Sequence, residues 1–179
     1  MLGPGSAACV TVDPVHNLVF VSGRSPGWGQ PYTPRLAQLI LDGREGRRNA
    51  LDGDDSIGQI LVFDRLASGN AKPLRILRGA KTMLSFPETL MTTYPPKGWL
   101  VAAQWGSEFG EHAESSPRSF VGVWSIYDNG NVAPHWTIGG PNGVLKEARG
   151  VALDPKHKEI FVSDKRINGV LAFEFPEMF

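Results

Sequence analysis

Two segments near opposite ends of the chain repeat each other without a gap. Residues 10–22 read VTVDPVHNLVFVS, and residues 151–163 read VALDPKHKEIFVS; a weaker third copy lies at residues 94–103. Each copy predicts a strand, a tight turn and a second strand, because proline has the fixed φ that suits a turn and no N–H to donate to a sheet. An internal repeat restricts the fold to architectures in which similar units pack on one another.

Further strands are predicted after each copy. Third strands are expected at residues 58–63, 120–124 and 168–173, and fourth strands at residues 69–77 and 130–138, where a Gly-Asn turn precedes each and glycine follows. The chain also has 21 glycines and 14 prolines, which favour many short strands over long helices. Four short antiparallel strands per repeat are the plan of a β-propeller blade, so we expect an all-β fold.

The spacing of the copies locates two insertions. The turn residues Asp13, Tyr94 and Asp154 are 81 and then 60 positions apart, whereas a blade takes roughly 40–50 residues. Both excesses fall between the second and third strands of a repeat. We therefore expect one domain over residues 1–179, with blade 1 at about 7–79 (insertion 23–56), blade 2 at about 88–140 (insertion 104–119) and a partial blade 3 at about 148–179.

The third repeat resembles an NHL repeat. Residues 150–164, GVALDPKHKEIFVSD, are followed by NGVLAF at residues 168–173. The NHL pattern is a Gly-Val-Ala-Val-Asp strand, a turn, an Ile-Tyr-Val-Ala-Asp strand and an Arg-Ile-x-Val-Phe strand. The first repeat follows it well and the second loosely, since Tyr94 replaces the turn aspartate. The resemblance implies a β-propeller; known members include protein- and RNA-binding modules, structural subunits, and a few lyases and hydrolases.

The predicted propeller is incomplete. Closed propellers have about four to eight blades, whereas this sequence predicts two full blades and three strands of a third. Three blades alone would expose apolar faces that normally pack on neighbouring blades. The chain is thus either a segment of a longer propeller, which we favour, or half of a propeller whose remainder comes from another chain.

Composition disfavours two classes of partner. The 18 basic and 18 acidic residues cancel, so no broad positive field attracts nucleic acid or anionic lipid. No apolar run approaches the roughly 20 residues of a membrane-spanning helix. Cys9 is the only cysteine, which we expect to be buried in a strand and which cannot form an intrachain disulfide.

The two insertions carry the candidate binding residues. In NHL-type propellers the loops between strands two and three share a rim with the loops between blades, so the resemblance places both insertions on one face with residues 80–89 and 141–148. Long loops on a rigid scaffold commonly bind partners, and arginine and aromatic side chains are favoured anchors in protein interfaces. The candidate interface residues are Arg24, Trp28, Tyr32, Arg35, Trp105, Glu108, Glu111 and His112.

Signals for catalysis or a metal are weak in the sequence. Residues 52–58 resemble the start of a calcium loop but lack its sixth-position glycine and twelfth-position glutamate. Glu111 and His112 alone do not supply the three or four ligands of a zinc site. His16 and His157 repeat at equivalent turns on the opposite face, which indicates a structural role. We therefore predict no catalytic residues, no metal and no cofactor.

The sequence thus leads to two functional hypotheses. The first is a non-catalytic protein-binding or scaffolding subunit that uses the loop face, with a protein partner or a second copy supplying the rest of the propeller. The alternative is a metal-dependent lyase or hydrolase of the NHL-like propeller type. Analogy with exported bacterial members of the family favours a periplasmic or extracellular location.

Overall fold

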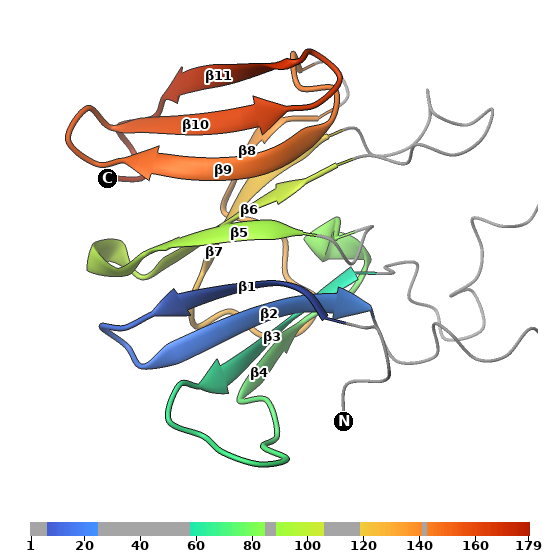
Figure 1. Cartoon of the computed structure of the whole chain (residues 1–179), viewed down its shortest axis with the longest axis vertical. Helices are drawn as coiled ribbons and strands as arrows, with labels where there is room; N and C mark the ends of the chain where they lie inside the picture. The colour runs from blue at the N-terminus through green and yellow to red at the C-terminus, as the bar shows by residue number, and fades with distance from the viewer. Residues whose placement is uncertain (1–6, 25–57, 85–88, 106–118, 141–142) are drawn as a thin grey trace, which may run out of the picture.

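The computed structural model describes residues 7–24, 58–84, 89–105, 119–140 and 143–179. These residues form three antiparallel sheets, stacked along the long axis of the molecule (Figure 1). Sheet 1 consists of β1 (Ala7–Asp13), β2 (Leu18–Arg24), β3 (Gly58–Asp64) and β4 (Arg75–Leu77). Sheet 2 consists of β5 (Leu90–Tyr94), β6 (Trp99–Gln104), β7 (Phe120–Ser125) and β8 (Trp136–Gly139). Sheet 3 consists of β9 (Ala148–Asp154), β10 (Glu159–Asp164) and β11 (Gly169–Glu174).

In each sheet every strand pairs with the next strand in the chain. The first strands β1, β5 and β9 lie next to one another, and the Thr93 hydroxyl of β5 donates a 3.1 Å hydrogen bond to the Val12 carbonyl of β1. The all-β prediction is confirmed, as is the absence of a fourth strand from sheet 3 within the described residues. The three sheets do not form a closed ring in the described part of the chain.

The predicted turn occupies the same place in all three repeats. Asn17, Gly98 and Lys158 align in the sequence, and all have positive φ, at 56°, 66° and 59°. In the second repeat the turn is the short 3-10 helix η3 (Pro95–Lys97), which ends at Gly98. The weak middle copy is thereby confirmed as a true repeat.

The two Asp-Pro-x-His turns are built identically. One oxygen of Asp13 accepts the backbone N–H groups of Val15 and His16 at 2.9 and 3.0 Å, and its other oxygen lies 2.7 Å from Nδ1 of His16. Asp154 repeats these contacts with Lys156 and His157. The expectation of a structural role for both histidines is confirmed.

The fourth strands are shorter than predicted. Residues 69–74 and 131–135 precede β4 and β8 outside the strands, and each segment contains a proline, which cannot donate to a ladder. Gly130 makes an isolated bridge with Leu77. The predicted turns are present, since Gly69 and Gly130 have positive φ of 66° and 78°. Cys9 lies in β1 but is half-buried rather than buried, because β1 is an edge strand of its sheet.

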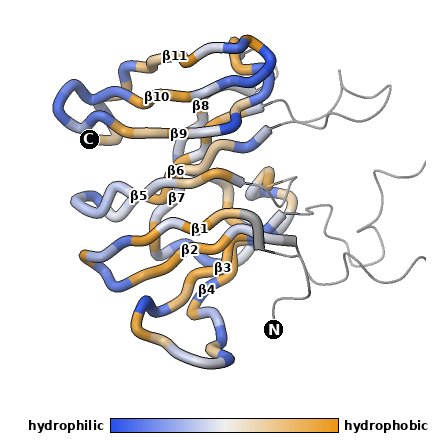
Figure 2. Tube along the Cα trace, in the orientation of Figure 1, coloured by the Kyte–Doolittle hydropathy of each residue, from blue (hydrophilic) through white to orange (hydrophobic). Residues whose placement is uncertain are grey.

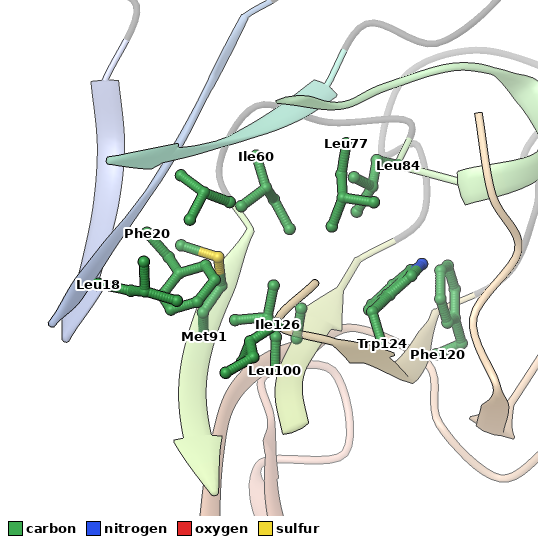
Figure 3. Close-up of a cluster of buried hydrophobic side chains, with 12 residues drawn as sticks. Leu18, Phe20, Ile60, Leu77, Leu84, Met91, Leu100, Phe120, Trp124 and Ile126 are labelled. Carbon is green, nitrogen blue, oxygen red and sulfur yellow. The ribbon is translucent and has the colours of Figure 1, made fainter. Parts of the chain in front are cut away.

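Two hydrophobic cores hold the stack together. The first joins sheets 1 and 2, where Phe20 and Ile60 of sheet 1 face Leu100 and Trp124 of sheet 2 (Figure 3). A second 3-10 helix, η2 (Ala80–Thr82), leads from β4 towards this core, which includes Leu84.

The second core joins sheets 2 and 3. Val101 and Val121 of sheet 2 pack with Ile160 and Val162 of sheet 3, and Met178, beyond β11, is fully buried there. Sheet 2 is therefore covered on both faces, which explains why β6 and β7 are buried at consecutive positions. Sheets 1 and 3 are the two ends of the stack.

No helix in the described residues is long and apolar enough to cross a membrane.

Candidate functional site: the loop rim

One edge of the stack, on the right in Figure 1, collects the ends of the strands that border the long connections. We call this edge the loop rim. β2 and β6 end there, and β3 and β7 begin there, so both insertions are rooted on it. The Gly58 N–H donates a 3.0 Å hydrogen bond to the Leu84 carbonyl, which joins the root of the first insertion to the connection between sheets 1 and 2. The strands that border the two insertions therefore meet at one edge of the stack.

Ser119 links the root of the second insertion to sheet 3. Its buried hydroxyl donates to the Gln104 carbonyl at 3.2 Å and accepts the Ala148 N–H at 2.6 Å. The Ser119 carbonyl accepts the N–H of Gly140 at 3.1 Å. One residue therefore holds the end of β6, the end of β8 and the start of β9 together.

A second buried contact supports the start of sheet 2. The Thr89 hydroxyl donates to Oε1 of Gln104 at 3.1 Å, and the Gln104 amide donates to the Trp105 carbonyl at 3.1 Å. Thr89 and Gln104 are each about 1% exposed. Because these polar groups are satisfied away from water, they hold the backbone of the rim in place.

In sheet 3 the carboxylate of Asp164 accepts four backbone hydrogen bonds, and we call this set of contacts the Asp164 clasp. One carboxylate oxygen accepts the N–H groups of Lys146 and Glu147, at 2.7 and 2.9 Å, and the other accepts those of Arg166 and Ile167, both at 3.1 Å. Burial alone would raise the pKa of the Asp164 carboxyl, but the four N–H donors outweigh burial and lower this pKa below its ordinary value. The ionised carboxylate thus ties the entry of β9 to the β10–β11 turn.

A charged cluster lies beside this clasp. The guanidinium of Arg149 is 2.6 Å from the buried carboxylate of Glu147, and Nζ of Lys165 is 3.3 Å from the same oxygen. The Arg149 guanidinium also lies over the indole of Trp105, 3.8 Å from the ring centroid. This combination of ion pairs and a cation–π contact fixes the arginine on the rim.

The candidate interface residues lie mostly outside the described part of the chain. Arg24 is the last residue of β2. Trp105 is only 6% exposed, and the guanidinium of Arg149 lies over its ring. Trp28, Tyr32, Arg35, Glu108, Glu111 and His112 fall outside the described residues, as do residues 52–57 of the calcium-like segment.

Sequence reasoning missed four residues that organise the rim: Ser119, Glu147, Arg149 and Asp164. Asp164 had a detectable signal, since it is the aspartate that ends the second strand of the NHL pattern. Ser119 and Arg149 make contacts between sheets 2 and 3, Glu147 pairs with Arg149, and no motif marks these three residues.

The opposite edge carries the turns between first and second strands, and we call it the turn rim. Among the residues that the structure describes, one group there could offer metal ligands. Asp154, His157 and Glu159 place one ligand atom each within 4.8 Å of one another. The hydrogen bond from His157 lowers the pKa of Asp154, and the same bond raises the pKa of His157 above its ordinary value. These directions describe an Asp–His ion pair.

Comparison with sheet 1 accounts for this group without a metal. Asp13 and His16 make the same contact, and Leu18, which cannot bind a metal, stands where sheet 3 has Glu159. The Asp–His pair is therefore a feature of the turn in both repeats.

The chain matches no protein-family model, and a search of curated proteins finds no match to it.

Proposed function

We propose that the protein is a non-catalytic scaffolding subunit that binds another protein through the loop rim. The observation that carries the proposal is the set of buried polar contacts joining the roots of the long connections. Ser119 ties the start of sheet 3 to sheet 2, whereas Gln104 and Asp164 hold strand ends within sheets 2 and 3. Loops held on a rigid base lose less conformational freedom on binding, so such a rim suits recognition.

The chemistry of the rim suits a protein partner. Arg149 is held in place by Glu147 and Trp105 and remains 27% exposed. Arginine and aromatic residues are enriched in protein interfaces, and the first insertion is rich in both. The balanced net charge favours a protein over nucleic acid. The NHL resemblance is consistent with this function, since many members of that family are binding modules.

The test is cross-linking in the source cells followed by mass spectrometry, with the tagged full-length chain. We expect one protein partner to be cross-linked near the strand ends of the loop rim. Shortening both insertions to glycine-serine linkers is expected to remove that partner. Lys156→Ala on the turn rim, an exposed position, is the matched control and should retain it.

Two results would overturn the proposal. The partner could persist after both insertions are shortened, or its cross-links could map to the turn rim. A stoichiometric divalent ion in the purified protein would instead favour the alternative of a metal-dependent lyase or hydrolase.

A further inference from the structure

The two ends of the stack expose faces whose counterparts inside the chain are buried. Each sheet has a forward face, turned towards the next sheet in the chain, and a backward face, turned towards the previous one. The forward face of sheet 1 packs on sheet 2, and that of sheet 2 packs on sheet 3. The backward face of sheet 1 and the forward face of sheet 3 are left over, and we call them the sheet 1 end face and the sheet 3 end face.

The sheet 1 end face is apolar apart from the buried Gln59, which the register places opposite Gly23 beside the loop rim. Strand alternation and register place two rows of side chains on it: Val12, Val19 and Phe63, then Val10, Val21, Leu61 and Ile76. Leu74, just before β4, donates its N–H to the Val62 carbonyl and lies beside the first row. Val10 and Leu74 are 62% and 54% exposed. Figure 2 shows the apolar character of β1, β2 and β3 at this end of the stack.

This face has the same chemistry as the buried backward face of sheet 3. There the rows are Leu153–Ile160–Phe173 and Val151–Val162–Leu171. The repeat aligns Val19 with Ile160 and Phe63 with Phe173. The rows of sheet 3 belong to the second core, where they pack on sheet 2. The sheet 1 end face therefore has the same apolar composition as a backward face that, in sheet 3, packs on the forward face of sheet 2.

The sheet 3 end face resembles, in turn, the buried forward face of sheet 1. Its rows are Ala152–Phe161–Ala172 and Gly150–Ser163–Val170. Phe161 and Ser163 align with Phe20 and Ser22, both of which are 0% exposed in sheet 1. By contrast Val170, on the sheet 3 end face, is 67% exposed.

We propose that the sheet 1 end face of one copy binds the sheet 3 end face of a second copy, head to tail. Two copies then close a ring of six sheets, a number within the range of about four to eight blades in propellers. Both new interfaces continue the pattern of the two interfaces inside the chain, in which a forward face always meets a backward face.

The area of one face favours ring closure over pairing of two sheet 1 end faces. Strands about 4.8 Å apart with a rise of about 3.3 Å per residue give a four-stranded face of roughly 400 Å². A standard interface buries about 800 Å² on each partner. Pairing of identical faces buries one face per copy, whereas the closed ring buries the four-stranded face and the smaller three-stranded face, roughly 700 Å² in all, which is close to the standard size.

The acidic residues of the sheet 3 end face lie at its margin. Glu159 and Glu174 form the last row with Asp154, beside the turn rim. Interfaces commonly have such a polar, solvent-accessible margin around an apolar centre. In the proposed interface the acidic row therefore lies at the solvent-accessible edge, outside the rows of Phe161 and Val170.

The experiment measures the mass of the full chain by light scattering after size exclusion. We expect twice the 19.5 kDa of one chain. Val10→Glu on one end face and Val170→Glu on the other form a matched pair, since both valines are more than 60% exposed within one copy. Each change should weaken the dimer by about 100-fold or more, because it affects both interfaces of the ring. Leu66→Glu, at a site 72% exposed on the β3–β4 turn, is the control and should remain dimeric.

Circular dichroism and thermal melting would establish that the variants fold. Val10→Thr and Val170→Thr, which preserve side-chain shape, replace any glutamate variant that does not. A folded wild-type monomer would overturn the proposal. A dimer lost with Val10→Glu but kept with Val170→Glu would show pairing of identical faces and would also overturn it. An assembly larger than two copies would overturn ring closure. The proposed function concerns the loop rim rather than the end faces, so either proposal can fail alone.

Discussion

Gly122 lies in β7 directly beneath the ring of Trp124, the largest fully buried side chain of the first core. A Cβ added at Gly122 would lie 2.5 Å from Cζ3 of Trp124, closer still to its Cη2, and 3.1 Å from Cε2 of Phe120. Ordinary contacts begin near 3.4 Å. Gly122→Ala therefore forces an indole in a filled core to move.

The magnitude follows from two opposing effects. Replacing glycine with alanine stabilises a compatible site by about 0.4–1 kcal/mol, because the unfolded chain has less conformational freedom. Overpacking a filled core costs about 1–3 kcal/mol. We expect Gly122→Ala to lower the free energy of unfolding by a net amount of about 1–2 kcal/mol, which for a chain of this size lowers Tm by about 2–8 °C.

Urea unfolding followed by circular dichroism measures this change. The matched control is Gly169→Ala in β11, where the added Cβ meets only Cγ2 of Ile167 at 3.9 Å. The control is expected to be neutral or slightly stabilising. Trp124→Leu should reduce the cost of Gly122→Ala, because the two changes share one contact. A neutral Gly122→Ala, or a cost unchanged in the Trp124→Leu background, would refute the predicted clash.

Three further predictions concern the clasp and the turns. Asp164→Asn should cost about 2–3 kcal/mol at pH 7, because an amide presents one acceptor to four N–H donors. Since folding lowers the pKa of Asp164, the stabilisation by its carboxylate is present above the unfolded pKa and is lost as pH falls through the folded pKa. The difference in free energy of unfolding between wild type and Asp164→Asn, measured by urea melts, should therefore shrink as pH falls. A difference that stays constant with pH would contradict this. Folding raises the pKa of His157, so the stabilisation by the protonated His157 is present below pH 6.5 and is lost as pH rises through the folded pKa. NMR titration should show the raised pKa of His157, and Asp154→Asn should remove the increase. Lys158→Gly should stabilise the protein by about 0.5 kcal/mol in the same melts, because positive φ is strained for lysine and Gly98 already fills the equivalent turn; a loss of stability would show that the lysine is unstrained.

The local elements of this protein could be predicted from the sequence because each depends on neighbouring residues. The Asp-Pro turns are made by hydrogen bonds spanning two or three positions, at Asp13 and at Asp154. The third strands pair with the strands before them as expected. The fourth strands are shorter than predicted. A proline precedes each of them, and because proline has no N–H to donate, regular strand pairing begins only after it.

The organisation of the loop rim required the tertiary structure. Ser119 and Ala148 are 29 positions apart, and Arg149 meets Trp105 across two sheets. No spacing in the sequence brings these residues together, because sheet packing sets their contacts.

By itself, the sequence determined the repeat, the strand order within each unit and the turns, since antiparallel neighbours are joined by short local links. Only the tertiary structure decided which face of each sheet is covered. Alternation assigns the side chains of every strand to two faces of the sheet, but it does not determine which other sheet, if any, packs on each face. Val19 and Ile160 occupy the same place in the repeat, yet Ile160 is fully buried by sheet 2 whereas Val19 lies on the sheet 1 end face. The physical reason is position in the stack, because an apolar face becomes core only where another sheet packs against it.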